Sequence, residues 1–321
     1  MNTNGYFLIS LDFELYWGVH DKSNISSYEK NINEVWTILP RLINLFNDYN
    51  VECTFATVGY LFAQNRSELN SYLPKSIPNY RDKNLCPYTK LEFINFEESL
   101  FNALPLIQLI SDSKHELGTH TFSHYYCLEE GQSKENFKSD INAAVKIANK
   151  KNVGIKSIVF PRNQVNENYF DTLKKFGIRS YRGSEKSWMY KPDKSKNEGL
   201  VKKLFRLTDS YINLSGYNTY PIPEKKQDLY NLPSSRFLRP FAPSLRIFEK
   251  KRLERITSAM NHAAQKNEVY HLWWHPHNFG DNVEENFLFL EKILKHYRFL
   301  SDKHNFTSVT MEGLSTIIDN R

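Results

Sequence analysis

Short apolar runs alternate along the chain with longer segments in which apolar residues recur every three or four positions. The short runs are rich in β-branched and aromatic residues, which favour buried strands. Seven of them predict strands, over residues 6–12, 51–57, 115–119, 156–160, 178–182, 269–274 and 306–309.

The longer segments have the spacing of amphipathic helices. In residues 28–50, Leu39, Leu42 and Phe46 fall on one helical face, and Pro40 predicts a kink or a break in this helix. Further helices are expected over residues 96–111, 133–151, 166–176, 246–266 and 284–300. The repeated order of strand and helix predicts parallel strands joined by right-handed crossovers.

Two stretches interrupt this order. Residues 71–91 contain three prolines and little periodicity, and residues 184–244 mix tyrosine, proline and basic residues with only short apolar runs. We interpret both as loop insertions on a barrel, so residues 1–321 are expected to form a single domain. The sequence contains no internal repeat and no low-complexity tract.

Composition narrows the class of protein. Of the 321 residues, 40% are hydrophobic and 24% are charged, which allows a sizeable core and excludes a disordered chain. Lys and Arg number 42 against 36 Asp and Glu, and the resulting net charge of +6 suits an anionic small substrate or a glycan. No arginine-rich stripe is present, so nucleic acid is not an expected partner. The aromatic content of 14% is high, and such rings line sugar sites as well as cores.

Cysteine usage and the N-terminus bear on the compartment. The three cysteines lie far apart without a CxxC pair, which argues against a disulfide framework and fits a reducing compartment. The first apolar run ends at Asp12, too early for a signal peptide, and no window approaches the roughly 20 apolar residues of a membrane span. We therefore expect a soluble, cytoplasmic protein.

Four polar groups stand at the ends of two predicted strands. His120 and His124 are four residues apart after one strand, and they could bind one metal ion if the strand runs into a helical turn; the alternative is a hydrogen-bonded surface pair. Asp12 and Glu14 close the first strand and point the same way if it stays extended, so that one could bind the ion while the other takes a proton from water. The alternative for this pair is simple exposure to solvent. Sites in parallel α/β proteins assemble at such strand ends, which favours the functional interpretation.

His275 follows the predicted strand 269–274 and could donate a proton to a leaving group, or it could be a structural histidine satisfied by loop carbonyls. His271 is expected to be structural, and His277 either supports the site or lies solvated in a loop. No comparable setting surrounds the other histidines, which are expected to be structural: His20, His115, His262, His296 and His304.

An arginine could hold Asp12 ionised and oriented as a base. Arg162, directly after Pro161 and the strand 156–160, is one candidate, although a loop arginine bound to carbonyls is an equal alternative. Arg182, at the end of another predicted strand, is its rival for this role or a substrate contact.

Four short motifs in this order resemble those of the polysaccharide deacetylase family, the carbohydrate esterases with NodB homology. They are Ser10-Leu11-Asp12-Phe13-Glu14, His120-Thr121-Phe122-Ser123-His124, Pro161-Arg162 and Trp274-His275-Pro276. The resemblance spans Tyr6 to His277. This chain departs from the common family pattern in separating its carboxylates by Phe13 and in placing Pro161 before, not after, the arginine.

The resemblance implies a distorted (β/α)7 barrel and a metal-dependent hydrolase that removes acyl groups from amino sugars. Carried over by residue, it makes Asp12 the catalytic base, Arg162 the residue that orients the base, and His275 the general acid. The implied metal ligands are Glu14, His120 and His124, with Zn²⁺ as the expected ion.

A cytoplasmic member suits sugar precursors better than cell-wall polymer. The expected substrate is therefore an N-acetyl or N-formyl amino sugar, nucleotide- or lipid-linked, of cell-surface polysaccharide or O-antigen biosynthesis. Two alternatives stay open: an amide or cyclic-imide hydrolase of the allantoinase type, and a catalytically inactive glycan-binding barrel. The sequence leaves the oligomeric state open.

Overall fold

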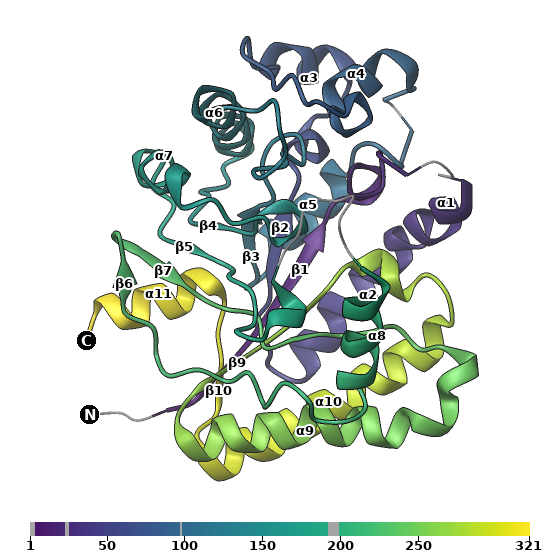
Figure 1. Ribbon diagram of the computed structural model, residues 1–321, viewed down its shortest axis with the longest axis vertical. Coiled ribbons are helices and arrows are strands. Elements are labelled where there is room, and N and C mark those ends of the chain that lie inside the picture. Colours follow the sequence, from purple (N-terminus) through teal and green to yellow (C-terminus); the bar gives the residue numbers. More distant parts are fainter. Residues whose placement is uncertain (1–3, 23–25, 97, 192–198) are drawn as a thin grey trace.

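A curled, mainly parallel β-sheet forms the centre of the molecule, and helices cover its outside (Figure 1). The computed structural model describes residues 4–22, 26–96, 98–191 and 199–321. Its strands are β1 Tyr6–Phe13, β2 Thr54–Thr57, β3 Glu116–Thr119, β4 Ser157–Ile158, β5 Ser180–Tyr181, β6 Lys225–Lys226, β7 Leu229–Asn231, β8 Arg236–Phe237, β9 Val269–Trp274 and β10 Thr307–Ser308.

Strand β1 is the central strand of this sheet. It pairs in parallel with β9 along one edge, from Tyr6 to Leu11, and with β2 along the other edge, from Ser10 to Phe13. From β2 the order continues through β3, β4, β5 and β7, with every pair parallel. All eight residues of β1 are buried, as is usual for a parallel strand covered on both faces.

The segment from β7 to β8 joins the two edges of the sheet. Its first half pairs with β5 and its second half pairs with β9, both in parallel. Backbone bonds continue this pattern between the two short strands, because Ser234 N donates to Gly183 O over 2.9 Å and Ser235 N donates to His271 O over 2.8 Å. The chain thereby closes a distorted (β/α) barrel with seven strand positions: β1, β2, β3, β4, β5, β7–β8 and β9.

All seven predicted strands form, but β10, predicted over residues 306–309, does not occupy one of the seven barrel positions. β10 pairs only with Tyr6 and Phe7 at the start of β1. The seventh position belongs to β7–β8, which lies inside the stretch 184–244 that the sequence led us to interpret as a loop. The interpretation is wrong there because this strand contains Pro233 and two serines in place of an apolar run, and backbone bonds to two different neighbours hold it.

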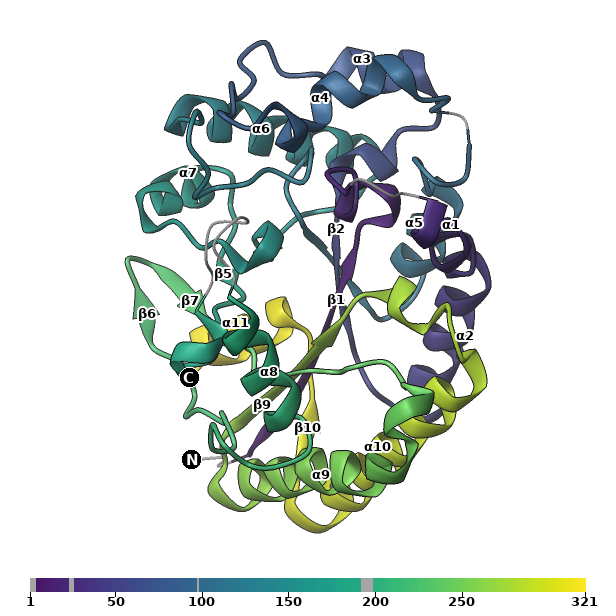
Figure 2. The same ribbon diagram turned by 45° about the vertical axis from the view of Figure 1, so that its right-hand side comes forward.

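The helices wrap the barrel, and Figure 2 shows α9 and α10 side by side along one flank. Their bounds are α1 Ser26–Asn33, α2 Val35–Asp48, α3 Arg66–Tyr72, α4 Pro87–Lys90, α5 Leu104–Ser111, α6 Lys134–Lys150, α7 Phe170–Lys175, α8 Leu200–Asp209, α9 Glu249–Lys266, α10 Val283–His304 and α11 Met311–Asp319. Among the described residues, no helix combines the length and the apolar character needed to cross a bilayer.

Two helix predictions need correction. The interruption in residues 28–50 falls at Glu34, between α1 and α2, and α2 continues through Pro40. A buried face that includes Ile38, Leu39 and Leu42 holds this helix against the core, and tertiary packing of this kind outweighs one lost backbone bond. The helix expected over residues 96–111 begins only at Leu104, with Pro105 in its first turn.

The stretch 184–244 is anchored over the barrel by Asp209, the last residue of α8. Residues 192–198 of this stretch lie outside the described residues. Asp209 is fully buried, and its carboxylate pairs with Arg236 at 3.0 Å and with Arg255 at 3.3 Å. Burial opposes the charge of Asp209, but Arg236 and hydrogen bonds from Tyr190 and Ser215 outweigh it and hold the pKa below its ordinary value.

Replacing Asp209 with asparagine should destabilise the protein by about 3 kcal/mol, because two buried guanidinium groups then lose their counter-charge. Urea unfolding followed by circular dichroism measures this loss. Asp228→Asn is the matched control, since its side chain is 81% exposed and pairs with Lys174 only at the surface. Equal stability of the two variants would contradict the anchoring role of Asp209.

Candidate active site

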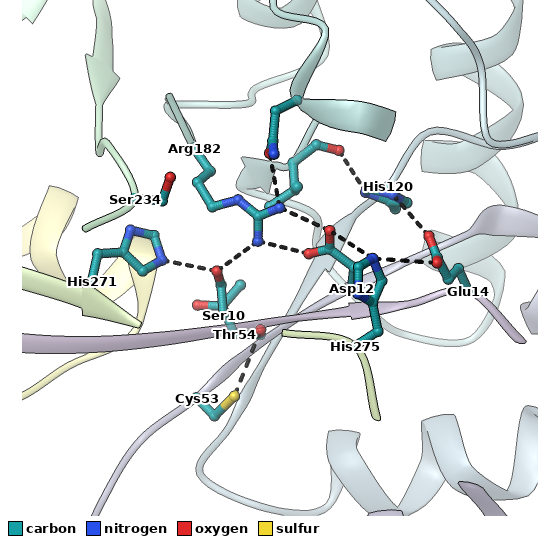
Figure 3. Close-up of polar contacts among 12 residues, drawn as sticks. Ser10, Asp12, Glu14, Cys53, Thr54, His120, Arg182, Ser234, His271 and His275 are labelled. Carbon is teal, nitrogen blue, oxygen red and sulfur yellow. Dashed lines mark hydrogen bonds and ion pairs between the residues drawn. The ribbon is translucent and has the colours of Figure 1, made fainter. Parts of the chain in front are cut away.

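Polar side chains from four strand ends meet at one end of the barrel (Figure 3). Asp12 and Glu14 lie at the end of β1, His120 follows β3, Arg182 follows β5, and His275 follows β9. All of these strands are parallel, so their carboxyl ends face the same side, where barrel sites are built.

Glu14, His120 and His124 form a group that could hold a metal ion. The Oε2 atom of Glu14 lies 3.3 Å from His120 Nε2 and 3.1 Å from His124 Nε2, and the three ligand atoms lie within 4.8 Å of one another. All three side chains are buried. One carboxylate and two imidazoles are a common donor set for a catalytic zinc site, which keeps a position open for water or substrate.

The protonation states of this group also fit a cation. His120 Nδ1 lies 2.8 Å from the carbonyl oxygen of Val159, and donation along this bond leaves the Nε2 lone pair facing Glu14. Burial lowers the pKa of His124 to about 4, so the imidazole is neutral. Burial opposes the charge of Glu14, but His275, His120 and His124 outweigh it and hold the pKa of this carboxyl well below its usual range.

The chain between the two histidines is a tight loop, not the helical turn expected from the sequence. Thr121 and His124 both have left-handed backbone angles, with φ of 65° and 64°, which L-residues rarely adopt. Thr121 Oγ1 accepts a bond of 2.7 Å from Tyr125 N. Asp140 of α6 accepts from Phe122 N over 2.7 Å and from Ser123 Oγ over 2.5 Å.

Asp140 therefore fixes the loop that presents both histidines. Sequence reasoning missed this residue, although a signal was available. Asp140 lies on the same helical face as Phe137, Ile141 and Ala144, all buried, and a carboxyl on an apolar face needs hydrogen-bond partners. Tyr88 OH supplies a further donor at 2.7 Å.

Arg182 is the partner of Asp12. Its Nη1 donates to Asp12 Oδ1 over 2.7 Å and its Nη2 to Asp12 Oδ2 over 2.8 Å, with the guanidinium 4.2 Å above the ring of Trp273. Burial opposes the charge of Asp12, but Arg182, His120 and His275 outweigh it, so that the pKa of Asp12 lies below its ordinary value. Asp12 is thus an ionised carboxylate in a buried place.

The expected pairing of Arg162 with Asp12 is wrong. Arg162 forms an ion pair with Asp21, lies 4.0 Å from Glu129 and stacks on Tyr126 at 4.2 Å. Arg162 and Asn163 both have a φ of 54°, a left-handed turn that the sequence does not reveal. From this turn it is Asn163 that contacts the pair, because its Oδ1 accepts from Arg182 Nη2 over 3.0 Å.

Behind Arg182 lies a chain of hydrogen bonds that sequence reasoning did not foresee. Ser10 Oγ accepts from Arg182 Nη1 over 3.0 Å and lies 2.8 Å from His271 Nε2, while His271 Nδ1 lies 3.2 Å from Leu232 O. Burial lowers the pKa of His271 to about 3, so this imidazole is neutral. His271 therefore supports Arg182 from behind, in agreement with the structural role expected for it.

His275 faces both carboxylates across the site. Its Nε2 lies 3.7 Å from Asp12 Oδ2 and 3.5 Å from Glu14 Oε1, and its Nδ1 lies 3.1 Å from the Oδ1 of Asn278. His277 is buried and stacks on His275 with 5.0 Å between ring centroids, so it lies against the site and is not a solvated loop residue.

These side chains open into a cavity of about 740 Å³. The charged end consists of Asp12, Glu14, His120, His124 and His275. The aromatic rings of Tyr190, Phe237 and Trp273 line it as well, together with Arg206 and Arg239. Three aromatic and several basic side chains thus surround the charged end, and most of them come from the stretch 184–244.

Comparisons with known proteins agree with this fold. Residues 32–181 match the family model described as polysaccharide deacetylase. The matched range contains both histidines of the loop and ends one residue before Arg182. The match covers a little under half of the chain and, together with the shared fold, supports an assignment to the polysaccharide deacetylase family.

Three solved structures share the fold of this chain at low sequence identity. A protein assigned as a polysaccharide deacetylase from Mycobacterium smegmatis superposes with a TM-score of 0.60 and 13% identity, covering 100% of this chain and 91% of the other. A second protein assigned as a polysaccharide deacetylase, from Pseudomonas aeruginosa PAO1, superposes with a TM-score of 0.54 and 10% identity. The superposition covers 98% of this chain and 90% of the other. The Puue allantoinase superposes with a TM-score of 0.53 and 9% identity, covering 97% of this chain and 88% of the other. No curated protein sequence matches the chain. The family match supports a deacetylase-type hydrolase, and it suggests a glycan as the substrate.

Replacing Arg182 with glutamine should destabilise the protein by about 3 kcal/mol, because Asp12 is left as an unpaired buried carboxylate. Arg162→Gln is the matched control, with an expected loss of about 1 kcal/mol, since the Arg162 side chain is 23% exposed. Urea unfolding of both variants gives the two values. A larger loss for Arg162→Gln would contradict the assignment of Arg182 as the central ion-pair partner.

Asp140 should make stability depend on pH in the acid range. Burial raises its pKa from 3.8 to about 6, so its contribution to stability is present below about pH 4 and is lost as the pH rises through about 6. Relative to Asp140→Asn, the wild-type protein should therefore lose about 3 kcal/mol of unfolding free energy between pH 4 and pH 7. Urea unfolding of the two metal-free proteins at each pH gives the difference in their unfolding free energies. The contributions of all other titrating groups cancel in this difference, because both proteins contain them. The same difference at both pH values would show that Asp140 does not titrate in this range.

Proposed function

We propose that this protein is a metal-dependent N-deacylase, a hydrolase that removes an acetyl or formyl group from an amino sugar. The observation that carries the proposal is the meeting of a possible metal site with an ionised carboxylate and a histidine on one cavity. Glu14, His120 and His124 supply the metal ligands, and Asp12 and His275 lie within 4 Å of one another beside them.

Zn²⁺ is the metal we propose, held by Glu14, His120 and His124. When bound, a divalent ion polarises the scissile carbonyl and the attacking water and stabilises the negative charge that develops on the carbonyl oxygen. The ligand group holds one carboxylate, so a divalent ion bound there would keep a net positive charge to face the carbonyl oxygen of the substrate.

Asp12 is the proposed general base. The bidentate bond from Arg182 keeps the carboxylate ionised and fixes its two oxygens, so that it is ready to take a proton from the attacking water. His275 is the proposed general acid, because its Nε2 faces the cavity from the other side of both carboxylates and can donate a proton to the departing amine. Asn278 orients this ring through Nδ1.

The cavity favours a sugar over a cyclic imide. A small imide substrate calls for a small, closed pocket, whereas the cavity here measures about 740 Å³ and has aromatic rings beside the charged end. Sugars stack on such rings. The allantoinase-type alternative is therefore less well supported, although the two share a fold. An inactive glycan-binding barrel would need neither Asp12 nor His275 in position.

We propose a nucleotide- or lipid-linked amino sugar as substrate, as a step of cell-surface polysaccharide or O-antigen biosynthesis in the cytoplasm. Arg206 and Arg239 line the same cavity as the carboxylates, and their guanidinium groups could neutralise a phosphate group of the substrate. All three cysteines are buried and unpaired, in keeping with a reducing compartment.

Metal removal and ligand substitution test the proposal. Protein stripped by a chelator should lose acyl hydrolysis and regain it with zinc or cobalt. The double variant His120→Ala, His124→Ala should lose bound metal and at least about 100-fold of the rate, since it lacks two direct ligands. His304→Ala is the control, because this histidine lies at the far end of α10 and should leave both readouts unchanged.

The readout is mass spectrometry of candidate nucleotide sugars and lipid-linked sugars after incubation, where one acetyl or formyl group should be lost. Elemental analysis gives the metal content of each variant. Full activity of the double variant, or full activity after metal removal, would sink the metal-dependent mechanism.

A further inference from the structure

Helix α8 turns its apolar side to solvent. Leu200 is 83% exposed, Val201 61% and Leu204 62%, whereas Asp209 on the opposite side is fully buried. At 100° per residue the exposed residues share one face of the helix. A surface helix of a globular protein normally directs its apolar stripe to the core, so the orientation of α8 is inverted.

The polar side of α8 is what holds it in this orientation. Asp209 forms ion pairs with Arg236 and Arg255, and the guanidinium of Arg206 lines the active-site cavity. Rotation of the helix to bury its leucines would break these buried pairs. The exposed apolar face is therefore a fixed feature of this fold.

Neighbouring residues extend the apolar face. Trp188 is 50% exposed and packs edge-on against Phe205, with 5.5 Å between ring centroids. Of the fourteen large hydrophobic side chains exposed in the described part of the chain, nine lie within residues 188–248: Trp188, Leu200, Val201, Leu204, Phe205, Ile212, Leu214, Ile247 and Phe248. An exposed apolar helix face extended by an aromatic pair marks an interaction surface.

The charge of this region points to the partner. The described residues 186–191 and 199–208 contain five Lys and Arg and no Asp or Glu, a local charge of +5 within a chain whose total is +6. If a second copy of the chain docked here through the same face, two regions of charge +5 would repel each other, so a symmetric dimer through this face is disfavoured. An apolar helix face set among basic residues is complementary to a bilayer that contains anionic lipids.

We propose that α8 and Trp188 dock the protein onto the surface of an anionic lipid bilayer. Tyr190, Lys191 and Arg206 belong to this region and also line the cavity, and α8 lies in front of the barrel in both views (Figures 1 and 2). Docking therefore brings the cavity to the membrane surface. The surface binds lipid whether or not the proposed reaction is correct.

Vesicle sedimentation tests the docking surface with the full-length protein. The wild type should bind vesicles of phosphatidylcholine and phosphatidylglycerol in equal parts, less at high salt, and should not bind phosphatidylcholine alone. The double variant Leu200→Glu, Leu204→Glu should bind at least about tenfold more weakly, because two apolar side chains no longer enter the interface. Leu288→Glu is the matched control, a leucine 56% exposed on α10 near α2, and should bind as the wild type does.

A second readout guards against misfolding. The substituted leucines are exposed in the free protein, so the double variant should keep the wild-type unfolding temperature. Trp188 fluorescence should shift to the blue when anionic vesicles are added, and Trp188→Phe should remove that shift. The proposal is overturned if the wild type ignores anionic vesicles or if the double variant binds them equally well. It is also overturned if the wild type is a dimer that the double variant converts to a monomer.

Discussion

The buried ion pair between Asp12 and Arg182 is the interaction on which the other features of this structure depend. The two residues are 170 positions apart, and both are buried. Removing two charges from water is unfavourable by several kcal/mol per ion unless every remaining bond is satisfied. Here Ser10 and Asn163 each accept one further N–H group of the guanidinium, and Trp273 covers its face, while Nε has no hydrogen-bond partner among the described residues. Because these groups come from different strand ends, the pair keeps its strength only while the barrel is closed.

The same arrangement separates the roles of two carboxylates that are only two residues apart. Asp12 faces a permanent cation, whereas Glu14 faces two imidazoles. Arg182 therefore supplies a fixed positive charge to the first, and the second can share its charge only with a proton or a metal ion. Differences in environment, more than in residue type, suit Asp12 to the proposed role of base and Glu14 to that of metal ligand. The Nε2 atom of His275 lies within 4 Å of both carboxylates and completes the site.

The sequence predicted those parts of the fold and the site that depend on local pattern. Apolar runs that end in Asp12, His120 or His275 mark buried strands and the polar groups at their ends. The pairing of Arg182 was open, because it depends on a left-handed turn at Arg162 and Asn163 and on closure by the segment of β7 and β8. Neither the turn nor this strand segment shows a regular spacing of apolar residues in the sequence. Asp140 was missed for a related reason, since its partners lie in a loop whose left-handed residues are threonine and histidine, not glycine.

One stretch of chain, residues 184–244, accounts for both the closure of the barrel and the exposed face of α8. Its second half contains the strand that bonds to β5 and β9, and the carboxylate of Asp209 ties α8 to Arg236 within that strand. The bond to Arg236 requires the polar side of α8 to face inward, so the apolar side must face outward. The exposed face thus follows from the way in which the barrel is closed. A substitution that loosened Asp209 would alter the cavity wall as well as the outer surface, because Arg206 and Arg236 line the cavity beside it.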